Sequence, residues 1–265
     1  MIGILDSGLG GVSVLREIRT RLPFEAITYV GDCAFCPYGN KEPKILRERV
    51  AAIVEFLLSE GAQLIVLACN SATIQTIEWC RKEWPSTPFV GMEPGVKPAV
   101  EASKNGIVGV LATEASLTGE MFAKLVAEHS KDCQILTQAC PDFVSLVEAG
   151  ILEGAEVDEA IERYASELCE AGADVLVLGC THYPFLQKRI NTLFPQVHLI
   201  NTGPAVAERV TQLLPKPITF SSSEPGLLRF FSSDCSQKMA QVLTTLWPEE
   251  SPTINCLPEK LISPC

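Results

Sequence analysis

The sequence predicts an α/β fold made of two similar halves, each a mostly parallel sheet flanked by helices. Short apolar runs alternate with longer segments of helical periodicity, the pattern of parallel strands joined by crossover helices. The segment at residues 61–70 returns in similar form at residues 172–181, and residues 3–7 are echoed at residues 109–113. Buried parallel strands resemble one another in many proteins. Two strands that recur in the same order, one of them ending in cysteine both times, nevertheless indicate two pseudo-symmetric domains.

In the first half, apolar runs with the length of strands occur at residues 2–5, 26–30, 64–67 and 88–91. Between them, helical periodicity predicts helices over residues 12–22, 44–59 and 71–84. A Pro-Gly pair near residues 92–95 marks the expected break between the halves.

In the second half, the alternation begins again with a strand at residues 106–111. Helices are expected at residues 120–129 and 158–171, ahead of the second cysteine strand. After a crossing near residues 201–204, helical runs at 205–214 and 235–247 and a strand at 227–231 complete the first half. We therefore expect one domain of residues 1–93 plus 206–265 and another of residues 94–205. The tail from Pro248 carries four prolines and is expected to be irregular.

Composition and charge exclude several classes of protein. The chain has 265 residues, enough to bury a substantial core, and a net charge of −11, which disfavours nucleic acid as a partner. No apolar run approaches the roughly 18 residues that read as a membrane-spanning helix. The N-terminal residues show no signal-peptide pattern, so we expect a cytoplasmic protein without a membrane partner.

The eleven cysteines argue against a disulfide framework, because they are odd in number and a cytoplasmic protein keeps its thiols reduced. Cys33 and Cys36 form a C-x-x-C pair. A zinc site would need a second such pair or suitably spaced histidines, which the three histidines do not provide. We therefore expect no metal, and we expect most cysteines to be small buried residues.

Three polar clusters follow predicted strands and precede predicted helices: Asp6-Ser7-Gly8, Cys69-Asn70-Ser71 and Cys180-Thr181-His182. The carboxyl ends of parallel strands are where sites form in α/β proteins. A helix N-terminus there attracts anions and lowers the pKa of a thiol, which makes the thiolate available as a base. Two such thiols suit the removal of a proton from one face of a carbon and its return to the other.

Structural explanations exist for each cluster. Asp6 is a plausible helix cap, and the following glycines suit a tight turn that lacks both the full G-x-G-x-x-G spacing and the Gly-Lys-Ser/Thr of a phosphate-binding loop. A single strand-end cysteine is more often structural than catalytic. Two at matched positions favour catalysis, and His182 beside the second is a better candidate than His129 or His198.

The motifs then resemble the cofactor-independent aspartate/glutamate racemase family, and the glutamate racemases within it. The resemblance is carried by residues 6–11 (DSGLGG), 37–39 (PYG), 68–73 (ACNSAT) and 179–184 (GCTHYP), with further matches at 91–94 (GMEP), 111–113 (LAT) and 139–141 (ACP). These matches run in the family's order from residue 2 to about residue 210. The sequences around the second cysteine and at residues 37–39 favour glutamate over aspartate or hydantoin relatives.

The resemblance implies a site in the cleft between two domains that interconverts L- and D-glutamate without cofactor or metal. D-glutamate would feed peptidoglycan synthesis, and a homodimer is one assembly that the family adopts. Cys69 would deprotonate the D-enantiomer with help from Asp6, and Cys180 the L-enantiomer with help from His182; Glu148 matches a family acid near the second thiol. The substrate would also be held by Ser7, Pro37, Tyr38, Gly39, Asn70, Ser71 and Thr181.

Some positions depart from the family pattern. Ser71 and Ser116 stand where threonine is common, Asn201 begins a segment that usually reads Asp-Ser-Gly, and Cys33 and Cys36 are particular to this chain. None of these changes removes an expected acid or base. The alternatives are a racemase of aspartate, a hydantoin or another small acid, and a relative that binds a ligand without turnover.

Overall fold

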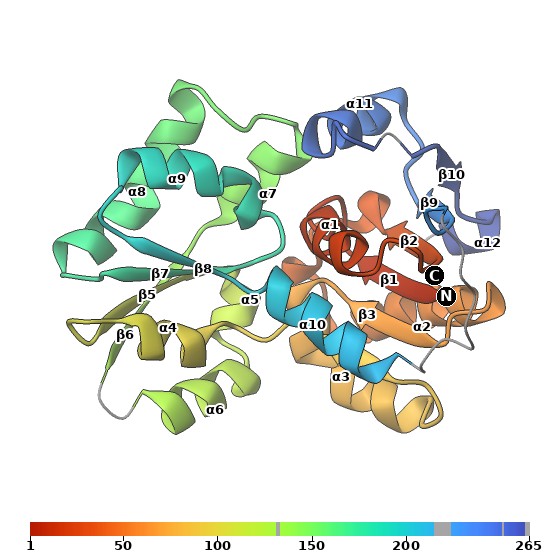
Figure 1. The fold of residues 1–265 in the computed structure, drawn as a ribbon, viewed down its shortest axis with the longest axis horizontal. Helices are drawn as coiled ribbons and strands as arrows, with labels where there is room; N and C mark the ends of the chain where they lie inside the picture. Colours follow the sequence, from red (N-terminus) through yellow and green to blue (C-terminus); the bar gives the residue numbers. More distant parts are fainter. Residues whose placement is uncertain (131–132, 215–223, 251, 263–265) are drawn as a thin grey trace.

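The computed structural model describes residues 1–130, 133–214, 224–250 and 252–262. It contains two sheets that lie side by side, each covered by helices on both faces (Figure 1). The larger sheet has six strands in the order β10-β9-β2-β1-β3-β4, and the smaller has four in the order β6-β5-β7-β8. Every strand pair in both sheets is parallel.

The strands of the larger sheet are β1 Ile2–Asp6, β2 Ile27–Gly31, β3 Leu64–Leu67, β4 Phe89–Gly91, β9 Leu228–Ser232 and β10 Ile254–Cys256. Those of the smaller sheet are β5 Ile107–Ala112, β6 Gln134–Ala139, β7 Val175–Gly179 and β8 His198–Asn201. The orders β2-β1-β3-β4 and β6-β5-β7-β8 correspond strand for strand. The two recurring sequences occupy equivalent places, since β1 matches β5 and β3 matches β7. The predicted pair of similar α/β halves is therefore confirmed.

The helices that join these strands are α1 Val12–Arg21, α2 Pro43–Ser59, α3 Asn70–Glu83, α4 Val96–Ala102, α5 Glu114–Leu117, α6 Glu120–His129, α7 Pro141–Glu148, α8 Ala155–Glu170, α9 Gln187–Leu193, α10 Gly203–Leu213, α11 Gln237–Leu246 and α12 Glu259–Ile262. Short 3-10 turns, η1 Cys33–Phe35, η2 Tyr38–Asn40 and η3 Tyr183–Leu186, lie near the strand ends. In the described parts of the chain, no helix is both long and apolar enough to cross a membrane.

The central strands are buried on both faces, which explains their continuous apolar sequences. Every residue of β1, β3 and β7 is buried. One apolar cluster extends across both halves, from Ile4 and Val66 of the larger sheet to Leu178 and Phe143 of the smaller side. Helix α10, which follows β8 of the smaller sheet, packs against α1 of the first half.

The tail after Pro248 was expected to be irregular, and this expectation was wrong. β10 pairs with β9 at the edge of the larger sheet, and α12 follows it. Leu257 and Leu261 are buried, and the Leu261 carbonyl accepts a hydrogen bond of 2.7 Å from Arg49. Because the expected tail also included Ser251 and residues 263–265, that part of it lies outside the described residues.

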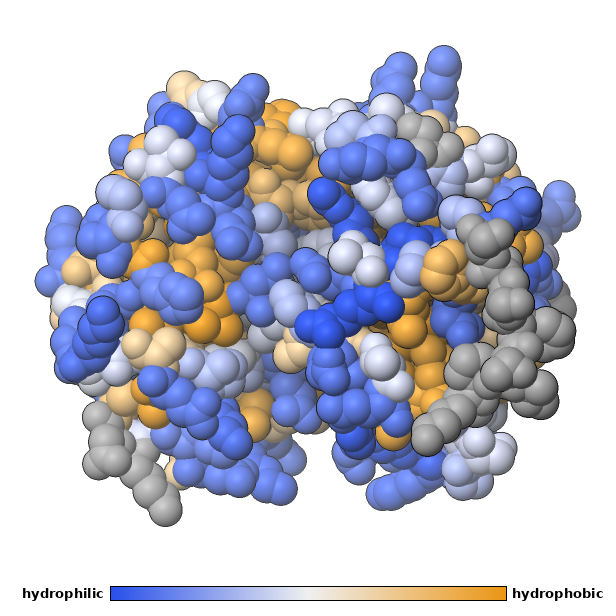
Figure 2. Space-filling view, in the orientation of Figure 1, coloured by the Kyte–Doolittle hydropathy of each residue, from blue (hydrophilic) through white to orange (hydrophobic). Residues whose placement is uncertain are grey.

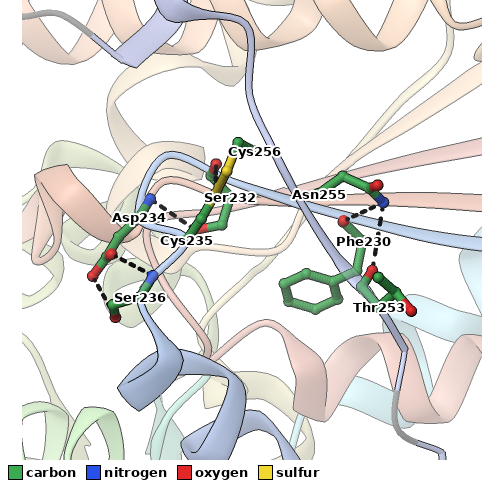
Figure 3. Close-up of a disulfide and its surroundings, with 8 residues drawn as sticks. All are labelled: Phe230, Ser232, Asp234, Cys235, Ser236, Thr253, Asn255 and Cys256. Atoms are coloured by element: carbon green, nitrogen blue, oxygen red, sulfur yellow. Dashed lines mark hydrogen bonds between the residues drawn. A yellow bond between two sulfur atoms is a disulfide. The ribbon is translucent and has the colours of Figure 1, made fainter.

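One cysteine pair also departs from expectation. Cys235 and Cys256 form a disulfide whose Cα atoms are 5.6 Å apart, joining the segment before α11 to β10 (Figure 3). Eight further cysteines in the described segments are free, among them Cys69, Cys180, Cys33 and Cys36. Within those segments, one bridge at the sheet edge therefore accompanies a set of free thiols, and the cysteines do not form a disulfide framework. On the face seen in Figure 2, hydrophobic residues gather in separate patches between hydrophilic ones.

Candidate active site

Three strands end at the candidate site. Asp6 is the last residue of β1, Cys69 follows β3 and precedes α3, and Cys180 follows β7. Because β1 and β3 are neighbours in one sheet and β5 and β7 in the other, both thiols stand at equivalent carboxyl ends. This is the edge at which α/β sheets bind ligands.

The glycine turn between β1 and α1 lets the two halves approach closely. A side chain at Gly8 would collide with the Glu148 carboxylate, and one at Gly10 would collide with His182 and Thr181. The Ser13 hydroxyl donates a hydrogen bond of 2.8 Å to the Thr181 carbonyl across the same junction. Gly8 and Gly10, predicted as part of a tight turn, thus also let residues of the second half pack directly against the backbone of this turn.

A chain of hydrogen bonds begins at the second thiol. The Cys180 sulfur lies 3.5 Å from His182 Nδ1, and His182 Nε2 lies 2.6 Å from Glu148 Oε1. Glu148 also accepts a 2.8 Å hydrogen bond from the Leu9 backbone N–H. The predicted group of Cys180, His182 and Glu148 is brought together in the folded chain.

The ionisation of this chain follows from its burial and its contacts. Burial of His182 opposes its charged form, but the contacts with Cys180, Cys36 and Glu148 outweigh burial and raise the His182 pKa well above its ordinary value. Burial likewise works against the Glu148 carboxylate, and its bonds with His182 and Leu9 outweigh this and lower the Glu148 pKa. The pair is therefore imidazolium and carboxylate near neutral pH.

The first thiol has a different environment. Cys69 is 6% exposed, and its Sγ donates a 3.6 Å hydrogen bond to the Ser7 hydroxyl. Burial, together with smaller contributions from the charges of Asp6 and Cys180, raises the Cys69 pKa to about 12. Cys69 is accordingly a protonated thiol near neutral pH.

Asp6 is near both thiols: its charge acts on Cys69, and it contacts Thr181, the residue after Cys180. Its carboxylate accepts hydrogen bonds from the Gly8 N–H at 2.9 Å and from the Thr181 hydroxyl at 3.2 Å. Burial raises the Asp6 pKa, while the charge on His182 lowers it to a smaller extent. Asp6 therefore closes the turn at Gly8 and is also a polar member of the site. It is not the expected helix cap, because Gly11 is the N-cap of α1 and no side chain caps that helix.

Asn70 is the clearest unpaired group among the described residues. Its side chain is buried, with the residue 2% exposed, and neither its amide nitrogen nor its amide oxygen has a hydrogen-bond partner there. A buried amide without partners costs free energy unless a ligand supplies them. Next to it, Ser71 Oγ lies 3.2 Å from the Thr113 hydroxyl, which belongs to the other half.

A cavity of about 840 Å³ opens between the halves, and it is lined by residues from both. Pro37, Gly39 and Glu148 are the predicted site residues in its wall. The two thiols lie outside this wall and are buried. Tyr38 points elsewhere: it is 1% exposed, and its hydroxyl donates a 2.6 Å hydrogen bond to Asp32.

Two residues at the site were not assigned to it from the sequence. Thr113 follows β5 and lines the cavity, and the repeat that pairs residues 109–113 with residues 3–7 was the signal that could have found it. Cys36 lies 3.8 Å from Glu148 Oε1, a contact between residues far apart in the chain that the C-x-x-C pattern did not indicate.

Comparison with known proteins agrees with this geometry. Residues 2–210 match the family model described as Asp/Glu/Hydantoin racemase. The chain is 44% identical over 247 residues to glutamate racemase of Pseudomonas paraeruginosa, covering 93% of each chain.

Solved structures extend the likeness. A glutamate racemase isoform from Bacillus anthracis matches with a TM-score of 0.86 and 30% identity, covering 98% of this chain and 97% of the other. Escherichia coli glutamate racemase, in complex with L-glutamate and the activator UDP-MurNAc-ala, matches with a TM-score of 0.84 and 31% identity over 96% of each chain. The chain therefore belongs to the Asp/Glu/hydantoin racemase family.

Proposed function

We propose that this chain is an isomerase that interconverts L- and D-glutamate by moving the α-proton between two thiols. The observation that carries the proposal is the pair of buried thiols, Cys69 and Cys180, at equivalent ends of equivalent strands. Relatives named glutamate racemase match almost the whole chain and support glutamate as the substrate. The proposed domains are residues 1–93 plus 206–265 and residues 94–205, in keeping with the strand content of the two sheets.

In the L-to-D direction, Cys180 as the thiolate takes the α-proton, and Cys69 gives its own proton to the opposite face. The reverse reaction exchanges these roles. The raised pKa of Cys69 suits a thiol that begins this direction as the proton donor. The ammonium group of a bound amino acid supplies the positive charge that would stabilise either thiolate. Asp6 assists Cys69, whereas His182, held by Glu148, assists Cys180.

The α-proton of an amino acid is weakly acidic, so a thiolate needs help from groups that stabilise the developing negative charge. Ser7, Asn70, Ser71 and Thr181 offer hydroxyl and amide donors, and the N-terminus of α3 offers backbone N–H groups. The unpaired amide of Asn70 is the strongest candidate, because a substrate carboxylate would accept from its Nδ2 and the substrate ammonium would donate to its Oδ1. Pro37, Tyr38 and Gly39 complete the proposed binding wall, Tyr38 through its backbone.

The proposed role in the cell follows from the reaction. D-glutamate would serve peptidoglycan synthesis, in the cytoplasm where its precursors are made, and hence cell-wall biogenesis and cell shape. The reaction needs no cofactor or metal, because two side chains carry both proton transfers. A homodimer remains an expected assembly.

The test is a panel of L-glutamate, L-aspartate and a hydantoin in deuterated water. We expect L-glutamate to lose its circular dichroism signal and to gain one deuterium at the α-carbon. Loss of the signal from L-aspartate alone would establish a relative with another substrate. Tight binding of glutamate without deuterium incorporation would establish a protein that binds without turnover, and either result would overturn the proposal.

A further inference from the structure

Three side chains with metal-binding atoms meet at the edge of the site. The Cys36 sulfur, a Glu148 carboxylate oxygen and a ring nitrogen of His182 all lie within 4.8 Å of one another. Cys36 Sγ is 3.8 Å from Glu148 Oε1, which is 2.6 Å from His182 Nε2. These residues come from three separate segments, so only the folded chain assembles them.

A thiolate, an imidazole and a carboxylate are a ligand set typical of zinc. Metal–ligand distances of about 2.0–2.3 Å place tetrahedral ligand atoms about 3–4 Å apart. Two of the separations, 2.6 and 3.8 Å, lie near this spacing and the third is within 4.8 Å, so small side-chain shifts would bring the three atoms to it. Two anionic ligands would also balance a divalent charge in this largely buried place.

We propose that Cys36, Glu148 and His182 form an inhibitory site for a zinc-like divalent cation. The cavity between the halves gives the ion access, because Cys36 and Glu148 both line its wall. The cavity side also leaves room for water as the fourth ligand. The ion would replace the Cys36 thiol proton and one imidazolium proton of His182, and both protons would pass to solvent.

Binding at Nε2 fixes the remaining ring proton of His182 on Nδ1, which faces the Cys180 sulfur at 3.5 Å. His182 could then neither accept a proton at that position nor keep its positive charge beside the thiol. The ion would therefore block proton transfer at Cys180, a consequence that rests on the proposed function. Because two protons leave when the ion binds, inhibition should strengthen as the pH rises.

Cobalt titration tests the site independently of activity. We expect the purified protein to bind one Co²⁺ with a thiolate-to-cobalt charge-transfer band, and Cys36→Val to lose that band. Cys33→Val is the matched control and should keep it, because Cys33 lines the same cavity but lies outside the three-residue cluster. No band in the unaltered protein, or a band that survives in Cys36→Val, would overturn the proposal.

Zinc inhibition tests the consequence. Racemisation should fall when Zn²⁺ is added and recover fully with a chelator. The zinc concentration for half inhibition should rise at least about tenfold in Cys36→Val. Loss of a residue that only supports a metal ligand already lowers metal affinity by about 10–100-fold, and loss of a ligand should lower it at least as much. Equal sensitivity in Cys36→Val would place the inhibiting ion on Cys69 and Cys180 and refute the inference. If cobalt binds as expected but neither the unaltered protein nor a variant racemises glutamate, the proposed function fails while the metal site stands.

Discussion

At the scale of single residues, Cys69 and Cys180 carry the proposed reaction. We expect Cys69→Ser and Cys180→Ser each to slow racemisation of glutamate by roughly 10²–10⁴-fold, the range that a positioned acid or base contributes. Serine holds its proton too tightly to exchange it near neutral pH. Circular dichroism of either enantiomer measures the rate, and Cys169→Ser, a change at a free half-buried thiol on α8, is the control. Unchanged activity in either site variant would refute the two-thiol mechanism.

Glu148 is expected to set the protonation of His182. Replacing it in Glu148→Gln removes the negative charge, one of the contacts that oppose the effect of burial, so the His182 pKa falls. NMR titration of the His182 ring nitrogens in both proteins measures this change. A His182 pKa equal in both proteins would show that Cys180 and Cys36 alone maintain it.

The same substitution has a pH-dependent effect on stability. Glu148 has a lowered folded-state pKa, so its contribution is present above its unfolded-state pKa and is lost as the pH falls. His182 has a raised folded-state pKa. Its contribution to stability is therefore full below its unfolded-state pKa and is lost as the pH rises through its folded-state pKa. The unfolding free energies of the unaltered protein and Glu148→Gln should differ most at pH values where Glu148 and His182 are both charged.

Asn70 should matter to binding more than to folding. In Asn70→Ala, KM for glutamate should rise about tenfold or more, because a hydrogen bond to a charged group contributes about 1.5–3 kcal/mol. Without glutamate, Asn70→Ala should lower the unfolding free energy less than Thr73→Val does, because the Asn70 amide has no hydrogen bond to lose. Thr73 accepts a 3.0 Å hydrogen bond from the buried Met92 N–H, so its replacement leaves that donor unpaired, at a cost of about 1–3 kcal/mol. A larger loss of stability in Asn70→Ala would contradict this view.

At the scale of elements, the C-terminal strand and helix should stabilise the larger sheet. Leu257 is 2% exposed and its N–H donates a 2.8 Å hydrogen bond to the Ser232 carbonyl. Leu257→Ala should lower the unfolding free energy by about 2–5 kcal/mol, as truncation of a core leucine does. Urea unfolding measures this. Leu227→Ala, at a position 65% exposed, should change it by no more than about 0.5 kcal/mol.

Three strands were predictable because they are continuously buried. β1, β3 and β7 each pair with a strand on both sides and are apolar except for Asp6 at the end of β1, so their sequences alone identify them. β6 lies at a sheet edge with residues such as Gln134 and Gln138, and β10 pairs on one side only; neither carries that signal. The tail was misread because its prolines conceal a three-residue edge strand.

The site divides in the same way. Asp6, Cys69 and Cys180 stand next to strands that the pattern already located, so their meeting followed from the geometry of parallel sheets. The contact between Cys36 and Glu148 joins a 3-10 turn region to the end of α7, and no periodicity relates them. The inward position of the Tyr38 hydroxyl likewise depends on Asp32 and on its ion pair with Arg49, which tertiary packing decides.

At the scale of the whole molecule, the proposed substrate should join two halves that each bring one thiol. Free glutamate at a concentration of 100 times its Kd should raise the unfolding free energy of the protein by about 2.7 kcal/mol. Tryptophan fluorescence reports the larger sheet, since Trp79, Trp84 and Trp247 all follow or precede its strands.

Hydrogen exchange at the amides of β5 and β7 reports the smaller sheet, so the two measurements separate the halves. Because the substrate would contact Cys69 from one half and Cys180 from the other, both probes should shift by the same free energy. L-norvaline, which lacks the side-chain carboxylate, is the control ligand and should shift neither by a comparable amount. Protection of only one sheet by glutamate would mean that the ligand contacts a single half, and the proton could not then pass between two facing thiols.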